Sequence, residues 1–215
     1  MTVRVAINGF GRIGRLVLRA AIESKQTQLE FVAINDFGSA EVNAHLLKHD
    51  TVHGPLACDI KATGDRLVAN GFDMRVLSEA LPHRLPWKEL GVDIVMECTG
   101  QFSDKKDATA HLEVGAKRVL VSAPSEGADK TIVYGVNDDS LTRHDIVVSN
   151  ASCTTNCLAP VAKVLHEAIG IERGFMTTIH SYTGDQRTVD TFHKDYRRAR
   201  AAGANSRASR RSRRL

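Results

Sequence analysis

One cysteine and one histidine stand where this sequence has the means for covalent chemistry on a carbonyl group. Cys153 lies between a β-branched run at residues 146–148 and an apolar helical pattern over residues 158–169. A thiol at such a strand-to-helix turn meets unpaired backbone N–H groups and the positive end of a helix dipole, which favour the thiolate. Residues 176–180 are typical of a strand that ends on His180. A thiolate nucleophile and an imidazole base together indicate a cysteine enzyme.

A glycine-rich turn near the N-terminus is the second group of residues with chemical meaning. Gly9, Gly11 and Gly14 give the spacing G-x-G-x-x-G, directly after a β run at residues 3–7 and at the start of a helical pattern. There the first glycine permits a tight turn, the second lets the backbone approach a pyrophosphate, and the third allows close helix–strand packing. Asp36 ends the next β run, about 20 residues further on. Its carboxylate would accept hydrogen bonds from ribose hydroxyls and repel a 2′-phosphate, so the pattern favours NAD over NADP.

An α/β scaffold must bring these groups together. β runs at residues 3–7 and 30–34 flank the first helical pattern, and this order makes a βαβ unit. We therefore expect an α/β fold, with a Rossmann-type dinucleotide-binding domain over residues 1–150 and an incomplete α+β catalytic domain over residues 151–202. The other expected elements are helices at 40–48, 105–114 and 158–169, hairpins turning at 63–65 and 70–71, and β runs at 92–96, 118–121, 131–134 and 146–148.

Composition narrows the class of protein. The 215 residues are 42% hydrophobic, which allows an ample core, and no apolar run reaches membrane-spanning length. The formal net charge of +4 comes from residues 203–215, which carry five arginines and no acidic residue. That basic tail has no hydrophobic period, and we expect it to be disordered. The four cysteines follow no disulfide spacing and no histidine cluster completes a zinc set, so we expect reduced thiols, no metal and a cytoplasmic location.

Three motifs carry a resemblance to a known family. With AINGFGRIG, SNASCTTN and TTIHSYTGDQRTVD in this order, residues 1–202 resemble the phosphorylating, bacterial type of glyceraldehyde-3-phosphate dehydrogenase. The resemblance implies a glycolytic, NAD-dependent oxidoreductase in which Cys153 is the nucleophile and His180 its base. The thiolate would add to the aldehyde carbon, hydride would pass to the nicotinamide, and inorganic phosphate would cleave the resulting thioester to an acyl phosphate. His180 would keep the thiol ionised and accept the hydroxyl proton of the hemithioacetal.

The resemblance also implies binding residues, position by position. Those that match the family's cofactor contacts are Asn8, Gly9, Phe10, Gly11, Arg12, Ile13, Gly14, Asn35, Asp36, Thr99, Gly100 and Ser122. Those that match contacts to the substrate and the attacking phosphate are Ser152, Thr154 and Thr183.

Plainer interpretations stand beside these. An isolated cysteine is usually a small buried hydrophobe, and we interpret Cys58 and Cys98 in this way, with Cys157 as a packing residue. The three hydroxyl residues assigned to substrate would serve equally as helix caps or turn residues. We assign no role to the remaining histidines, His45, His49, His53, His83, His111, His144, His166 and His193.

After residue 202 the sequence departs from the family's pattern. An arginine–serine run stands where the family continues into the rest of its catalytic domain. We therefore expect a chain truncated by a frameshift or an early stop, which binds NAD with little turnover. The family's homotetramer would lack much of its subunit contact in such a chain.

Two other functions are alternatives. An erythrose-4-phosphate dehydrogenase shares the glycine loop and SNASCTTN, although residues 122–125 and 183–186 favour the triose enzyme. A non-catalytic cofactor- or nucleic-acid-binding remnant would use the arginine tail to contact phosphates. That tail has no aromatic residue on which bases would stack, so we expect no nucleic-acid partner and no membrane partner.

Overall fold

The computed structural model describes residues 2–184, 186, 188–193 and 195–204. By contacts the chain divides into two units, residues 1–171 and 172–215, and each is described by itself. Most of the tail expected to be disordered, residues 205–215, lies outside the described residues. The domain boundary expected near residue 150 stays a prediction.

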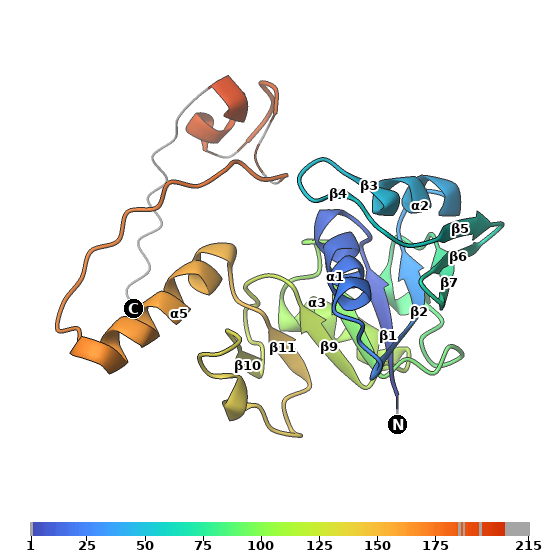
Figure 1. Cartoon of the computed structure of the whole chain (residues 1–215), viewed down its shortest axis with the longest axis horizontal. Coiled ribbons are helices and arrows are strands. Elements are labelled where there is room, and N and C mark those ends of the chain that lie inside the picture. The colour runs from blue at the N-terminus through green and yellow to red at the C-terminus, as the bar shows by residue number, and fades with distance from the viewer. Residues whose placement is uncertain (1, 185, 187, 194, 205–215) are drawn as a thin grey trace. The chain divides into compact units, whose positions relative to one another are not determined.

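The first unit is built on a mixed β-sheet of nine strands within the described residues (Figure 1). The strand order is β10-β11-β9-β8-β1-β2-β7-β6-β5, with β1 between β2 and β8. The chain therefore leaves β1 in one direction and returns to its other side, which makes this position the switch point of a doubly wound sheet. The parallel strands are β1 (Val3–Asn8), β2 (Leu29–Asn35), β7 (Phe72–Leu77), β8 (Ile94–Glu97), β9 (Arg118–Val121), β10 (Lys130–Thr131) and β11 (Val147–Ser149).

Both faces of the sheet are covered, as the apolar β runs predict for parallel strands. On β1, Val5 and Ile7 point into one core cluster, which includes Leu18 of helix α1 (Arg12–Glu23). Ala6 points to the opposite cluster, which contains Trp87. Figure 1 shows α1 along the sheet beside β1. The expected α/β fold class is confirmed.

The expected hairpins form at the far edge of the sheet. β5 (Ile60–Thr63) and β6 (Arg66–Ala69) pair antiparallel, as do β6 and β7, around the two predicted turns. Gly64, in the first turn, has a φ of +59°, and Gly71, in the second, has a φ of +87°, a region that favours glycine. Helix α2 (Ala40–Lys48) forms as predicted and begins at Ser39, whose hydroxyl accepts the Val42 N–H.

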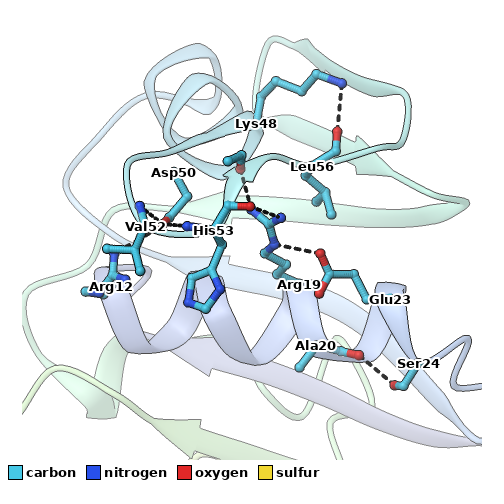
Figure 2. Close-up of polar contacts among 11 residues, drawn as sticks. Arg12, Arg19, Ala20, Glu23, Ser24, Lys48, Asp50, Val52, His53 and Leu56 are labelled. Carbon is cyan, nitrogen blue, oxygen red and sulfur yellow. Dashed lines mark hydrogen bonds and ion pairs between the residues drawn. The ribbon is translucent and has the colours of Figure 1, made fainter.

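Hydrogen bonds from two arginines of α1 hold the segment that follows α2 (Figure 2). It contains the short strands β3 (His49–Asp50) and β4 (Gly54–Pro55). The Asp50 carboxylate accepts the His53 N–H and a hydrogen bond from Arg12, each 2.9 Å long. The His53 N–H is the main cause that lowers the Asp50 pKa to about 2. Buried Arg19 donates to the carbonyl groups of Gly54 and His53, at 2.7 and 3.0 Å.

The structure departs from two sequence predictions of regular structure, the first only by a break in the helix. The helix expected over residues 105–114 forms as two short helices, α3 (Lys105–Ala108) and α4 (Ala110–Glu113), because the backbone tightens to a bond from Leu112 N to Thr109 O. Residues 176–180 are exposed and form no strand in the described part of the chain. A β run forms a strand only when a neighbour pairs with its backbone, and the described residues of the second unit supply no such partner.

Helix α5 (Cys153–Ile169) continues through Pro160 and ends at Gly170, which has a φ of +74°. It has no buried residue, and its apolar side chains Val161, Val164 and Ile169 are 55%, 64% and 79% exposed. The other helical elements are short 3₁₀ turns at Pro82–Arg84, Asp138–Ser140, Tyr196–Arg198 and Ala202–Ala204. Among the described residues, no helix combines the length and apolar character that a membrane span requires.

Candidate cofactor and active site

Most of the predicted site residues lie just beyond the carboxyl ends of five neighbouring parallel strands. These strands, in spatial order, are β2, β1, β8, β9 and β11. We call the edge formed by residues 8–14, 35–36, 97–100, 122 and 149–154 the crest. Neighbouring strands lie about 4.8 Å apart, so the crest extends for roughly 20 Å from β2 to β11. In doubly wound sheets ligands bind at this edge, next to the switch point.

The glycine loop shows why each glycine stands where it does. A Cβ atom at Gly9 would lie 2.6 Å from the Thr99 backbone nitrogen, and the φ of +89° is itself strained for other residues. A Cβ at Gly14 would lie 2.3 Å from the Gly9 carbonyl oxygen. A Cβ at Gly11 would meet no heavy atom within 4 Å. The first and third glycines therefore serve packing, and the second leaves open space above the loop.

That open space lies at the N-terminus of α1. Gly11 is the N-cap residue, so no side chain caps the helix, and the first turn contains no acidic residue. The first N–H groups of a helix lack partners within it and attract an anion. Arg12 follows at the first position of the helix, and its guanidinium pairs with the Asp50 carboxylate at 2.9 Å. These features fit a pyrophosphate group.

Asp36 is joined to the same loop by direct hydrogen bonds. Its Oδ2 atom accepts the Phe10 N–H at 2.9 Å, and its Oδ1 atom accepts the Gly38 N–H at 3.1 Å. A carboxylate has about four acceptor positions, so capacity is left for two ribose hydroxyls. The acidic residue and the glycine loop thus form one structural unit.

The side chains of Asn8 and Asn35 are buried and bonded to each other, from Asn35 Nδ2 to Asn8 Oδ1 at 2.7 Å. Asn8 Nδ2 also donates to the buried carboxylate of Glu97 at 2.6 Å. The side chains of these two asparagines therefore stabilise the crest from within, and cofactor contact through them stays a prediction. Thr99 and Gly100 follow Glu97 at the end of β8, and the Ser122 N–H donates to the Glu97 carbonyl at 3.0 Å.

Cys153 is the first residue of α5 and is exposed. The Ser152 hydroxyl caps this helix by accepting the Thr155 N–H at 3.1 Å, so the plain capping interpretation holds for this residue. Asn156 Nδ2 donates to the carbonyl groups of Asn150 and Ser152, at 2.8 and 3.0 Å. These bonds hold the turn that places the thiol at the positive end of the helix dipole, where a thiolate is favoured.

Sequence reasoning missed the residues that shape this turn. Ala151 is buried with a φ of +58°, an uncommon conformation for a residue with a Cβ atom. The Ser149 hydroxyl holds it by accepting the Ala151 N–H at 3.1 Å. A left-handed alanine leaves no signal in the sequence. Cys157, interpreted as a packing residue, is instead exposed.

Cys98, which follows β8 in the crest, differs chemically from Cys153. Burial raises the pKa of the Cys98 thiol to about 11 from its ordinary value of 9.0, and the hydrogen bond with Ser122 only partly offsets this. A raised thiol pKa means that the folded state holds a proton that the unfolded state releases first. The resulting stability is present below about pH 9 and is lost as the pH rises toward about 11.

We therefore expect the free energy of unfolding of the wild-type chain, relative to Cys98→Ala, to fall between about pH 9 and about pH 11. Urea unfolding of both proteins across this range measures the difference and cancels the titration of other groups. A difference that stays constant over the whole range would contradict the assignment.

The second unit holds the remaining predicted residues, His180 and Thr183. His180 Nδ1 lies 2.5 Å from the Ser181 carbonyl oxygen. A carbonyl only accepts, so Nδ1 carries the proton and Nε2 of the neutral ring is the basic nitrogen. The Thr183 N–H donates to Gln186 Oε1 at 2.9 Å. Cys153 belongs to the first unit and His180 to the second, and their pairing stays a prediction.

The doubly wound sheet, the uncapped glycine loop and the carboxylate of Asp36 define a dinucleotide-binding protein with a cysteine at one end of its crest. Comparison with known proteins makes this specific. Residues 3–105 match the model of the glyceraldehyde 3-phosphate dehydrogenase NAD binding domain, and residues 152–207 match that of the C-terminal domain of the same enzyme. This chain belongs to the glyceraldehyde-3-phosphate dehydrogenase family.

Individual relatives agree with the family models. The chain is 63% identical over 202 residues to glyceraldehyde-3-phosphate dehydrogenase of Xanthobacter flavus, and also to that of Cereibacter sphaeroides. It is 57% identical over 203 residues to the same enzyme of Geobacillus stearothermophilus. In each comparison the match covers 94% of this chain and 60% of the relative, so the chain spans about three fifths of the length of these proteins.

Proposed function

We propose that this chain binds NAD along the crest and carries the nucleophile for phosphorylating oxidation of glyceraldehyde 3-phosphate. The observation that carries the proposal is the continuity of the crest. Asp36 at the end of β2, the uncapped start of α1 after β1, and Cys153 after β11 lie along one edge. A dinucleotide laid along this edge would have its adenosine ribose at Asp36, its pyrophosphate over Gly11, and its nicotinamide toward Cys153.

The chemistry follows from what the chain's own residues do. The Cys153 thiol gives its proton to His180 Nε2, and the thiolate adds to the aldehyde carbon. The resulting alkoxide takes this proton and becomes the hemithioacetal hydroxyl, which returns the proton to Nε2 when the hydride leaves. Bound NAD supplies the hydride acceptor that oxidises this intermediate to a thioester. Inorganic phosphate then attacks the thioester carbon, the carbon–sulfur bond breaks, and the Cys153 thiolate is restored. Hydroxyls and N–H groups at the start of α5, with Thr154 and Thr183, would bind the phosphate groups.

We further propose that the chain as given binds NAD with little steady-state turnover. The apolar residues of α5 are exposed, so the helix that carries Cys153 lacks the packing that would hold a nucleophile rigidly. The cofactor residues after β1, β2 and β8 follow the buried side chains of Asn8, Asn35 and Glu97. NAD binding at these residues does not require a rigid α5. A homotetramer is not needed for this binding.

Cofactor choice tests the proposal at Asp36. Asp36→Asn removes the negative charge and replaces one acceptor oxygen with an NH₂ group, so we expect NAD affinity to fall about tenfold and the preference for NAD over NADP to shrink by a similar factor. Calorimetric titration with both cofactors measures the two dissociation constants.

Asp65→Asn is the matched control, because its carboxylate is 62% exposed on the hairpin between β5 and β6 and should change neither constant. The proposal fails if the wild-type chain does not bind NAD. It also fails if Asp36→Asn leaves the ratio of the two affinities unchanged.

A further inference from the structure

A series of hydrogen bonds between buried side chains links the crest residues Asn8 and Glu97 to His111 and Trp87. Glu97, at the end of β8, is 1% exposed, and His111 of α4 is 0% exposed. His111 Nε2 lies 3.1 Å from Glu97 Oε2, and Trp87 Nε1 donates to His111 Nδ1 at 2.9 Å. Burying groups of this kind is costly unless their hydrogen bonds are complete.

The hydrogen bonds determine where the protons lie. An indole N–H only donates, so His111 Nδ1 must accept from Trp87 and carry no proton. His111 is then the neutral tautomer with its proton on Nε2, which donates to Glu97. The hydrogen bond from Trp87 thus determines that His111 donates to Glu97 and does not accept from it.

Glu97 joins two loops of the cofactor site. Its Oε2 atom accepts from Asn8 Nδ2 at 2.6 Å, at the start of the glycine loop. Its Oε1 atom accepts the Thr99 N–H at 2.8 Å and also the Thr99 hydroxyl. All four partners, His111 included, donate, so the carboxylate is an acceptor on both oxygens. Asn8 extends this series of hydrogen bonds to Asn35 on β2, whose Nδ2 atom donates to Asn8 Oδ1.

The two loops also meet through their backbones, which makes their spacing sensitive. The Cys98 N–H donates to the Asn8 carbonyl at 2.7 Å, and Gly9 is held so close to Thr99 that a Cβ atom has no room there. A shift of Glu97 would therefore move the start of the glycine loop and the Thr99–Gly100 turn relative to each other.

We propose that Glu97 and His111 are positioning residues of the cofactor site, with Trp87 fixing the His111 tautomer. They hold the loops after β1 and β8 in the register that lets one dinucleotide contact both. The inference rests on the proposed NAD binding. The adenosine end at Asp36 is bonded to Phe10 and Gly38 and does not depend directly on Glu97.

The test compares NAD with AMP, which carries only the adenosine end. His111→Leu removes the donor to Glu97, and we expect the dissociation constant for NAD to rise about tenfold or more while that for AMP changes less than about twofold. His111→Gln offers an amide N–H to Glu97 and a carbonyl to Trp87, so it should restore most of the NAD affinity. Calorimetry on the full chain measures both ligands.

The only tryptophan of the chain supplies a second readout. The Trp87 indole N–H resonance should shift when NAD is added to the wild type and to His111→Gln. It should stay unmoved in His111→Leu, where the link to Glu97 is broken.

The affinities for NAD and AMP distinguish failure of this inference from failure of the proposed function. Equal loss of NAD and AMP affinity in His111→Leu would mean a general loss of folded protein and would overturn the inference, as would wild-type NAD affinity in that variant. A wild-type chain that binds AMP but not NAD would overturn the proposed function and this inference with it.

Discussion

Adding a single methyl group at Gly14 is expected to destabilise the first unit by about 3 kcal/mol. In Gly14→Ala the new Cβ atom would lie 2.3 Å from the Gly9 carbonyl oxygen and 2.9 Å from Ile7 Cγ2. The carbonyl belongs to the turn itself and the isoleucine is 0% exposed in the core, so neither neighbour can move away cheaply. The midpoint of urea unfolding, followed by circular dichroism, measures the loss.

Gly11→Ala is the matched control from the same loop. Its Cβ atom would meet no heavy atom within 4 Å, and the backbone φ of −69° is ordinary for alanine. We expect its free energy of unfolding to stay within about 1 kcal/mol of the wild type. Its NAD affinity should nevertheless fall, because the methyl group occupies the space above the loop that a pyrophosphate needs.

The pair separates folding from binding within one motif. Equal stability of the two variants would contradict the packing role of Gly14. Unchanged NAD affinity in Gly11→Ala would contradict the position of the pyrophosphate.

Replacing Cys153 should remove the reactive thiol of the chain. The thiolate attacks the methylene carbon of iodoacetamide and displaces iodide, and the thiol at the first position of α5 lies at the positive end of the helix dipole. In Cys153→Ser we expect the fast phase of alkylation near neutral pH to disappear and the remaining reaction to be about tenfold slower. Labelling that is quenched at successive times and analysed by peptide mass spectrometry identifies which cysteine reacts.

Cys157→Ser is the control, since this cysteine is also exposed on α5 but lies one turn further from the helix start. It should retain the fast phase. Cys98, whose pKa is raised to about 11 by burial, should be labelled last. Fast labelling of Cys157 in the Cys153→Ser protein would show that exposure, rather than the helix start, controls reactivity.

Local sequence signals were sufficient for much of the fold. Alternation of β runs and helical periods predicted the βαβ unit, α2 and both hairpins, because these features depend on residues close together in the chain. The glycine spacing predicted the tight turn between β1 and α1 for the same reason. The strand expected at residues 176–180 did not form, because a strand depends on a partner that its own sequence cannot specify.

Local sequence signals did not predict the buried contacts that support the site. His111 had no motif around it, and it meets Glu97, 14 residues earlier, only because α4 packs below the end of β8. Asn8 reaches the same carboxylate across 89 residues of sequence. The left-handed backbone of Ala151 likewise depends on the hydroxyl of Ser149 and on the turn into α5.

By itself, then, the sequence determined the chemical groups of this protein: a thiol before a helix, three glycines after a strand, and a carboxylate at the end of the next strand. These features are local, since a few neighbouring residues define each one. The tertiary structure alone decided that five strand ends stand side by side as one crest, and that buried His111 bonds to Glu97 in it. Strand order arises from how helices cover both faces of a sheet, and burial brings together polar groups that are distant in the chain.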